Sequence, residues 1–382
     1  MLPRIAMVST FPPTQCGIAT FAESLATSLT HAGAPVEIID LPSGPEAAAH
    51  DAVLHRHRGR HDLPVTSYLL DTFDAVILQH EFGIWDGPDG EGIVHLIGSL
   101  AVPVITVLHT VPAVATGGQR RALQQILDLS DAVVVLSHSA YRRLRRDFAV
   151  RPGTLTMIPH GATALWHRRR DVDPAARPSI LTWGLLGQGK GLEWGIRAMA
   201  LLRDRGLNAE YVIAGATHPN VRRAEGEAYR QSLIDLAERL GVATRVRLAD
   251  RYLSDQRLAD LISDASVFLL PYDSRDQITS GVLVEAIAAG GPVVATRFPH
   301  AAELLSQGAG VVVDHQDPLA IADALEGILR DGTASNGMRE RSRALAAELS
   351  WSRVGTDYLD LADRLWRGHP IAGSSQDRLV VA

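Results

Sequence analysis

Short apolar stretches alternate with helix-like stretches along almost the whole chain, and this alternation limits the folds open to it. Between the first two apolar stretches, Ile18, Phe21, Leu25 and Leu29 recur at helical spacing and so share one face. Strands without a polar face, separated by helices, are typical of a parallel sheet covered on both sides. The strand candidates of the first half are residues 4–9, 36–40, 75–79, 104–109, 132–136 and 156–158.

The second half repeats the alternation after an Arg-rich stretch, 166–178, that has neither helical nor strand periodicity. A chain of 382 residues is long enough for two domains with separate cores. We therefore expect α/β domains at 1–165 and 179–350, a linker at 166–178 and a flexible tail at 367–382. Strands are expected at 180–183, 210–214, 245–249, 267–270, 293–296 and 310–313, and helices at 192–202, 225–240, 318–330 and 351–366.

Composition excludes several other classes. The net charge of −6 gives no support to general nucleic-acid binding. A single cysteine, Cys16, rules out an internal disulfide and fits a reducing compartment. No signal-peptide pattern precedes the first strand, and no apolar run reaches the roughly 20 residues of a membrane span. The sequence predicts a cytoplasmic protein, and nothing in it indicates an oligomeric state.

Residues 277–296 hold the most specific pattern of the chain. Ser280 and Gly281 open a helix with little side-chain bulk, so the backbone N–H groups of Gly281, Val282 and Leu283 can face a bound anion. Glu285 follows about one turn later, where a carboxylate can accept hydrogen bonds from a sugar. A Gly-Gly-Pro break and a buried strand complete the segment. A phosphate-binding site beside a carboxylate suits a sugar nucleotide.

This segment resembles the donor-binding signature of retaining GT-B glycosyltransferases, in particular glycosyltransferase family 4. In that family one glutamate stands at the place of Gln277 and a second at the place of Glu285, so the first is replaced here by an amide. The resemblance extends to residues 9–21, 107–110, 134–137, 158–161 and 184–191. It implies two Rossmann-like, doubly wound α/β domains that face a cleft, with the helix at 351–366 crossing back onto the first domain.

The stretch Gly184-Leu185-Leu186-Gly187-Gln188-Gly189-Lys190-Gly191 lies between a predicted strand and a predicted helix. It satisfies the spacing of a P-loop, but Gly191 stands where Ser or Thr should hold Mg²⁺. The family resemblance implies instead that Gly189 and Lys190 bind the donor diphosphate. Leu185 replaces an arginine of the family pattern, so a second cation is either missing or supplied by Arg251, Arg275 or Arg297.

Candidate residues of the first domain follow its strands. Gly17 precedes a helix, which is either an ordinary turn or, as the resemblance implies, a donor-phosphate contact. His109 ends a strand, where open α/β sheets bind ligands, and the resemblance implies that it holds the donor sugar. Gln79, His80 and Glu81 end another strand and are candidates for acceptor contacts, although a buried structural histidine explains His80 equally well.

The resemblance implies a retaining transfer of a hexosyl group from a UDP-, GDP- or ADP-linked sugar to a glycan, lipid-linked or small-molecule acceptor. The catalytic set would be His109, Lys190, Gln277 and Glu285, with no cofactor. Gln277 cannot stabilise an oxocarbenium-like centre by charge. Either the sugar specificity differs from that of relatives, or activity is reduced. The alternatives are a catalytically inactive GT-B module that binds nucleotide sugar or glycan, and a P-loop ATPase.

Other charged motifs are weaker. Asp171-Val172-Asp173 has the D-x-D form of a metal site but lies in the predicted linker, and His55, His57 and His61 sit among arginines, so we predict no metal site. Four arginines, at 142, 143, 145 and 146, share one predicted helix. They form either a solvated face or a peripheral contact with an anionic membrane.

Overall fold

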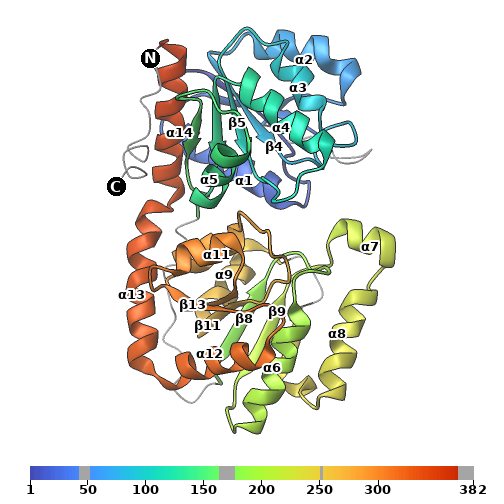
Figure 1. The fold of residues 1–382 in the computed structure, drawn as a ribbon, viewed down its shortest axis with the longest axis vertical. Helices are drawn as coiled ribbons and strands as arrows, with labels where there is room; N and C mark the ends of the chain where they lie inside the picture. The colour runs from blue at the N-terminus through green and yellow to red at the C-terminus, as the bar shows by residue number, and fades with distance from the viewer. Residues whose placement is uncertain (43–51, 163–176, 250–252, 369–382) are drawn as a thin grey trace. The chain divides into compact units, whose positions relative to one another are not determined.

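A computed structural model describes residues 1–42, 52–162, 177–249 and 253–368. The chain divides into two compact units (Figure 1). Unit 1 comprises Met1–Gly161 together with Trp351–Ala382, and unit 2 comprises Ala162–Ser350. Most of the predicted linker, the Asp171-Val172-Asp173 motif, Arg251 and the predicted tail from residue 369 lie outside the described residues.

Unit 1 is built on a seven-stranded sheet in the order β3-β2-β1-β4-β5-β6-β7, and every neighbouring pair is parallel. Its strands are β1 (Ile5–Ser9), β2 (Val36–Asp40), β3 (Val53–Arg56), β4 (Ala75–His80), β5 (Val104–Leu108), β6 (Ala132–Val135) and β7 (Leu155–Met157). Six of these match the apolar stretches of the sequence within one residue at each end. The edge strand β3 was not predicted, because it joins two apolar residues to a histidine and an arginine and none of the four is buried.

Helices cover the sheet of unit 1, and the last of them comes from the far end of the chain. They are α1 (Gly17–His31), α2 (Leu63–Leu70), α3 (Gly92–Ile97), α4 (Gly117–Leu129), α5 (His138–Asp147) and α14 (Trp351–Trp366). The Ser28 hydroxyl of α1 donates to the Trp351 carbonyl at 2.6 Å. A Cβ at Gly355 would lie 2.1 Å from Ser28 Oγ, so the absence of a side chain lets the two helices approach closely. The expected return of the C-terminal helix to the first domain is confirmed.

Unit 2 contains a six-stranded parallel sheet in the order β10-β9-β8-β11-β12-β13. Its strands are β8 (Ser179–Trp183), β9 (Glu210–Ala214), β10 (Val246–Ala249), β11 (Val267–Leu270), β12 (Val293–Thr296) and β13 (Gly310–Val313). Its helices are α6 (Leu192–Asp204), α7 (Pro219–Glu225), α8 (Ala228–Arg239), α9 (Asp255–Asp264), α10 (Gly281–Ala288), α11 (Pro299–Leu305), α12 (Pro318–Arg330) and α13 (Gly332–Glu348). The single helix predicted at 225–240 is wrong in extent, because the chain breaks at Gly226, where φ is +62°.

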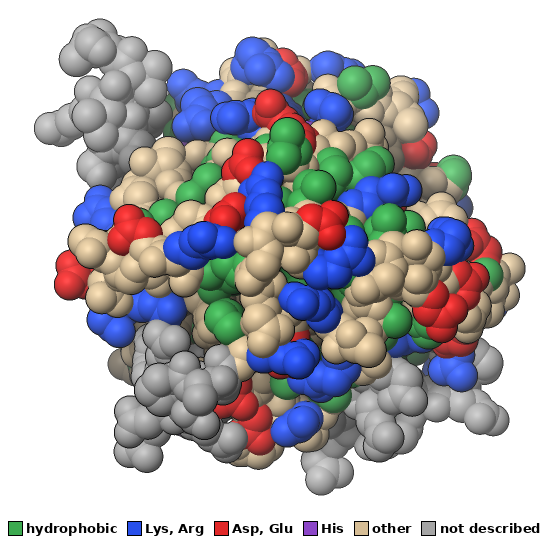
Figure 2. All heavy atoms as spheres, turned by 90° about the horizontal axis from the view of Figure 1, so that it is seen from below, with side chains coloured by type: hydrophobic (Ala, Val, Ile, Leu, Met, Phe, Trp, Pro, Cys, Tyr) green, Lys and Arg blue, Asp and Glu red, His purple; other side chains and the backbone are tan. Residues whose placement is uncertain are grey.

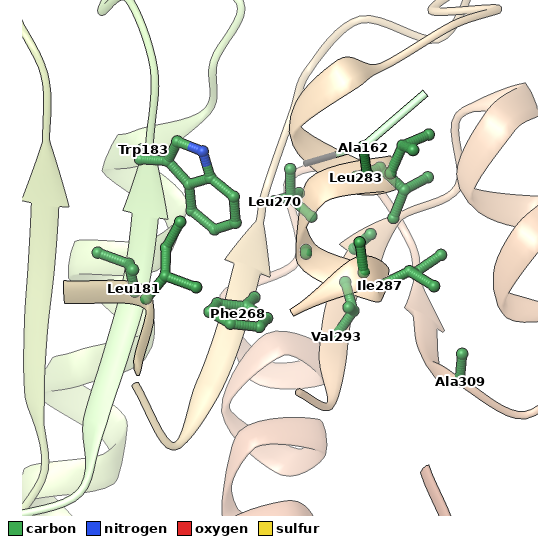
Figure 3. Packing of buried hydrophobic residues seen from close by; sticks show 14 of the residues in the cluster. Ala162, Leu181, Trp183, Phe268, Leu270, Leu283, Ile287, Val293 and Ala309 are labelled. Atoms are coloured by element: carbon green, nitrogen blue, oxygen red, sulfur yellow. The ribbon is translucent and has the colours of Figure 1, made fainter. Parts of the chain in front are cut away.

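Alternate residues of the unit 2 strands enter cores on opposite faces of the sheet. In β8, Ile180 packs with α6 and α12, whereas Leu181 and Trp183 pack with α10. Figure 3 shows the second core, in which Trp183 lies edge-to-face against Phe268 with ring centroids 5.3 Å apart. This two-sided burial explains why the strands read as continuous apolar runs.

The surface carries charges of both signs. On the face shown in Figure 2, and apart from the grey residues, Lys and Arg side chains are interspersed with Asp and Glu. Ion pairs between helices account for part of this mixture, such as Arg205 with Asp323 at 2.7 Å and with Glu326 at 2.8 Å. Within the described ranges, no helix is both long and apolar enough to cross a membrane.

Candidate functional site

The strand order of each sheet reverses once, and most of the predicted site residues follow the strands at these two places, whereas His109 follows β5, the neighbour of β4. In unit 2, β8 has β9 on one side and β11 on the other, so the segments after β8 and β11 leave the sheet at its switch point. In unit 1 the corresponding pair is β1 and β4. Ligands of doubly wound sheets bind at the carboxyl ends of strands where the order reverses. Each unit therefore presents one candidate site.

In unit 2, the loop from Gly184 to Gly191 is fixed against the segment that follows β11. The Asp273 N–H donates to the Gly189 carbonyl at 2.9 Å. A Cβ at Gly191 would lie 1.9 Å from the Pro271 carbonyl oxygen, and its φ is +60°, so only glycine fits there without strain. The residues on either side of Lys190 in the chain, Gly189 and Gly191, are thus both in contact with the segment that follows β11.

An aromatic ring holds the Lys190 side chain. Its Nζ lies 4.4 Å from the centroid of the Tyr272 ring, which is a cation–π distance. Tyr272 is buried and stacks on Phe298 with ring centroids 5.3 Å apart. The pKa of nearby His218 is lowered, first by burial and then by the Lys190 charge. Lys190 is thus a cation on a rigid support, suited to an anionic ligand.

The N-terminus of α10 supplies two of the three predicted backbone donors. The Leu283 N–H donates to the Ser280 hydroxyl at 3.2 Å, so the helix cap already uses this group. The first helical bond runs from the Val284 N–H to the Ser280 carbonyl at 3.2 Å. Gly281 and Val282 precede that bond, and their N–H groups point out of the first turn. Gly281 and Val282 therefore remain the candidate anion donors of this turn, whereas the Leu283 N–H is already engaged by the cap.

The carboxylate of Glu285 is held by a residue that the sequence did not single out. The indole Nε1 of Trp183 donates to Glu285 Oε2 at 3.0 Å. Trp183 is the last residue of β8 and is 4% exposed. Because Trp183 is buried at the end of a strand, its hydrogen bond holds the Glu285 carboxylate in one direction. Both residues flank the switch point of the sheet.

Gln277 and the segment to Ser280 form a tight turn before α10. Gln277 Nε2 donates to the Thr279 carbonyl at 3.2 Å. The Ser280 N–H donates to His300 Nδ1 at 2.9 Å, and the His300 N–H donates to the Gln277 carbonyl at 3.4 Å. An amide suits position 277, because a carboxylate would face a carbonyl oxygen.

Two of the candidates to replace the missing arginine of the family pattern, Arg275 and Arg297, lie in the described part of unit 2. Leu185 occupies its place. Arg275 is exposed, and Arg297 is 60% exposed and pairs with Asp314 at 3.4 Å. No described contact joins Arg275 or Arg297 to Lys190.

In unit 1, His109 lies directly after β5 and bonds to the end of β4. Its Nε2 and Gln79 Oε1 are 2.8 Å apart. Because an amide oxygen only accepts, Nε2 carries the proton and Nδ1 is an acceptor. Burial lowers the pKa of His109 to about 3, with further lowering by His160 and His80. The ring, packed edge-to-face on Phe21 at 4.8 Å, is therefore neutral and can accept a hydrogen bond from a hydroxyl.

The three acceptor-side candidates differ in access. Gln79 and His80 are 0% exposed, which does not fit direct contact with an acceptor. Strand β4 runs one residue further than predicted and packs His80 inside, where burial lowers its pKa to about 3. Glu81 is half-buried, and burial raises the pKa of its carboxyl despite a hydrogen bond from Thr110. Of the three, Glu81 remains the candidate for a substrate contact, and Gln79 instead orients His109.

Gly17 is the first residue of α1, directly after its cap. Cys16 caps this helix by accepting the Ala19 N–H on its sulfur at 3.3 Å. Gly17 is exposed, and a Cβ built there would meet no atom within 4 Å. Packing within the described structure therefore does not require glycine at this position, and a ligand contact at Gly17 stays a prediction.

The described residues of the two units contain no cluster of metal ligands. Among the residues with described positions, no group of three or more His, Cys, Asp and Glu side chains is arranged to hold a metal ion. His57, one of the three histidines near arginines, instead bonds through Nδ1 to the Thr66 hydroxyl at 2.9 Å.

Solved structures of other proteins share this fold. Sucrose-phosphate synthase from Thermosynechococcus elongatus matches with a TM-score of 0.78 at 19% identity, over 96% of this chain and 100% of that one. HepE from Anabaena, solved in complex with UDP, matches with a TM-score of 0.72 at 14% identity, over 94% of this chain and 99% of that one. The predicted fold class is confirmed: this is the GT-B fold, with two parallel α/β units.

The sequence places the chain within that class. Residues 16–163 match Glycosyltransferase Family 4, and residues 177–331 match Glycosyl transferases group 1. The chain belongs to this family of glycosyltransferases, as the motifs predicted.

Curated relatives carry one shared name. D-inositol 3-phosphate glycosyltransferase from Corynebacterium diphtheriae is 28% identical over 274 residues, which are 66% of this chain and 62% of the relative. The protein of that name from Xylanimonas cellulosilytica is 28% identical over 334 residues, which are 84% of this chain and 76% of the relative. The chain thus spans less than two thirds of the length of the first of these relatives.

Proposed function

We propose that the chain is a retaining glycosyltransferase that moves a hexosyl group from a nucleoside-diphosphate sugar to a glycan, lipid-linked or small-molecule acceptor. One observation carries the proposal beyond family membership. A cation, a helix N-terminus and a carboxylate, from Lys190, α10 and Glu285, all adjoin the switch point of the unit 2 sheet. These three groups match the diphosphate and ribose of a sugar nucleotide.

The chemistry follows from charge. The acceptor hydroxyl oxygen bonds to the anomeric carbon, the bond from that carbon to the diphosphate breaks, and the proton passes to the departing phosphate. Lys190 and the N–H groups of Gly281 and Val282 stabilise the charge that grows on the bridging oxygen. Glu285 accepts from the ribose hydroxyls. Neutral His109 accepts from a sugar hydroxyl, and Glu81 contacts the acceptor.

Support for the substrate classes comes from the neighbours. HepE has been solved with UDP-glucose, and the curated relatives are named for D-inositol 3-phosphate. A nucleoside-diphosphate sugar is therefore the donor class, and phosphorylated polyols belong among the first acceptors to test. UDP-, GDP- and ADP-sugars form the donor panel.

A peripheral membrane contact through α5 stays a prediction. Three of its four arginines already have partners: Arg142 donates to the Ser139 hydroxyl at 3.2 Å, Arg143 donates to the Val111 carbonyl at 2.5 Å, and Arg146 pairs with Asp147 at 2.7 Å. Arg142 and Arg145 are exposed. Sedimentation with vesicles that contain anionic lipid, beside vesicles of neutral lipid, tests the contact.

The test combines binding with turnover. Purified protein is screened for thermal shifts with UDP-, GDP- and ADP-sugars and with ATP–Mg²⁺, because a ligand of the native state raises its melting temperature. We expect a selective shift with one sugar nucleotide, loss of that shift in Lys190→Ala, and no turnover in Lys190→Ala or Glu285→Ala although both variants stay folded. Full activity in either variant would overturn the site assignment.

A second candidate function has its own observation. The substitution at Gln277, together with Leu185, favours a catalytically inactive module that binds nucleotide sugar. Binding of a sugar nucleotide without release of nucleoside diphosphate, in the presence of an acceptor panel, would select this function. A shift with ATP–Mg²⁺ alone would select the ATPase alternative.

A further inference from the structure

The turn that leads into α10 is held by a buried histidine outside the predicted site. His300 lies in the first turn of α11 and is 2% exposed. The ring accepts the Ser280 N–H on Nδ1 at 2.9 Å, and the backbone N–H of His300 donates to the Gln277 carbonyl at 3.4 Å. One residue thus binds both ends of the four-residue turn before the helix.

The bond from the Ser280 N–H specifies the protonation state of the imidazole. Nδ1 can accept only when it carries no proton, so the neutral ring has its proton on Nε2. Ser280, whose N–H the ring accepts, is the cap of α10 and holds the Leu283 N–H with its hydroxyl. The ring therefore fixes the cap residue, and the cap fixes the direction of the first N–H groups of the helix.

The same short segment also supports the cation. Phe298, two residues before His300, is fully buried and stacks on Tyr272 at 5.3 Å. Tyr272 in turn carries the Lys190 Nζ at 4.4 Å from its ring centroid. Both parts of the anion site, the cation and the helix N-terminus, are thus anchored to the turn that begins α11.

We propose that His300 is a positioning residue, which sets the N-terminus of α10 for the diphosphate of the donor. The proposal rests on the proposed function for the identity of the ligand. It does not require His300 to touch the substrate. It requires that the Ser280 N–H have an acceptor at the place of Nδ1.

Two substitutions separate this role from simple packing. Asn at position 300 offers a side-chain oxygen near the place of Nδ1, whereas Phe fills a similar volume and leaves the Ser280 N–H buried without an acceptor. We expect His300→Phe to weaken binding of the matching nucleoside diphosphate about tenfold or more, and His300→Asn to stay within about threefold of wild type. Binding of the free nucleoside should change little in either variant, because it lacks the diphosphate.

A matched control comes from unit 1. His57 is also buried and also uses Nδ1 in a hydrogen bond, to the Thr66 hydroxyl, so His57→Phe measures the general effect of such a loss on stability. Amide hydrogen exchange of residues 277–284, followed without ligand, provides the direct readout of the turn. We expect faster exchange there in His300→Phe but not in His300→Asn or His57→Phe.

The outcomes separate the two proposals. Equal exchange of residues 277–284 in wild type and His300→Phe, or equal binding of nucleoside diphosphate by both, would overturn the positioning role and leave the proposed function intact. A different result would separate the turn from the ligand: amide exchange is faster in His300→Phe, but the wild-type protein binds neither inorganic pyrophosphate nor any nucleoside diphosphate. This result would show that His300 holds the turn before α10. It would also overturn the donor site, and with it the role of His300 in donor binding.

Discussion

The indole Nε1 of Trp183 and the carboxylate oxygen Oε2 of Glu285 lie 3.0 Å apart, although the two residues are 102 positions apart in the chain. The bond joins the end of β8 to α10 across the place where the strand order reverses. A carboxylate that receives a fixed donor on one oxygen presents the other in a defined direction. Packing of the strand against the helix thus orients the carboxylate that we propose for substrate binding.

Replacing Trp183 by Phe removes the N–H donor and keeps an aromatic ring against Phe268. We expect kcat/KM for the donor to fall about tenfold, because the Glu285 carboxylate loses its fixed partner. Steady-state kinetics over a range of donor concentrations provides the measurement. Trp194→Phe is the control, since it loses a bond of the same kind, to Asp273 at 2.9 Å, but not to Glu285. Equal kinetic losses in both variants would contradict a specific role for Trp183.

Tyr272 should act through its ring and not through its hydroxyl. That hydroxyl is buried without a hydrogen-bond partner in the described structure, so Tyr272→Phe should keep activity and raise the free energy of unfolding by about 1 kcal/mol. Tyr272→Leu removes the face that carries Lys190 and should lower kcat/KM about tenfold. Urea unfolding and donor kinetics of the two variants check both statements. A loss of activity in Tyr272→Phe would show instead that the hydroxyl contacts substrate.

Acid should destabilise unit 1 through its buried histidines. Burial lowers the pKa of His80 and His109 to about 3 and that of His160 to about 4, all below the ordinary 6.5. A histidine whose pKa is lowered in the folded state takes up a proton only on unfolding when the pH lies between its folded-state pKa and 6.5. The stability that this neutral histidine contributes above pH 6.5 is therefore lost as the pH falls toward the folded-state pKa. Each histidine then contributes a loss of about 1.4 kcal/mol per pH unit.

The pH dependence can be measured by urea unfolding at intervals from pH 7 to pH 5. Replacing His80 by Leu should make the fall in stability shallower, because one buried group no longer takes up a proton on unfolding. Replacing exposed His31 by Gln serves as the control. A slope that is the same in wild type and His80→Leu would show that His80 is not the responsible group.

Gln277→Glu restores the residue type of the family pattern but places a carboxylate where the amide donates to the Thr279 carbonyl. We expect a changed preference among sugar nucleotides, together with a loss of about 1 kcal/mol in stability from the lost bond and the new repulsion. Kinetics across a panel of UDP-, GDP- and ADP-sugars is the measurement. Unaltered kinetics on every donor would count against a role for position 277 in donor choice.

The sequence predicted the sheets well because most of the inner strands are buried on both faces and are therefore nearly continuous apolar runs. It missed β3, where the exposed edge of the sheet admits polar residues. It also missed α7, none of whose residues is buried, and it began the helix of α8 three residues too early, before the break at Gly226. Motifs also selected the loop of Lys190 and the start of α10. The partners of these residues were beyond reach, because the contacts of Trp183 with Glu285 and of Ser280 with His300 exist only once the chain is folded. The same holds for His80, a polar residue that the packing around β4 encloses.

The return of α14 to unit 1 has a consequence for synthesis of the chain. Unit 2 is one continuous segment, Ala162–Ser350, whereas unit 1 is interrupted by it. Val354, Tyr358 and Leu361 of α14 belong to the core of unit 1. During translation, all of unit 2 leaves the ribosome before that core can close, so the domain that begins first is the one that must finish last. Until α14 emerges, the apolar surface of α1 that it covers stays open to solvent or to a chaperone.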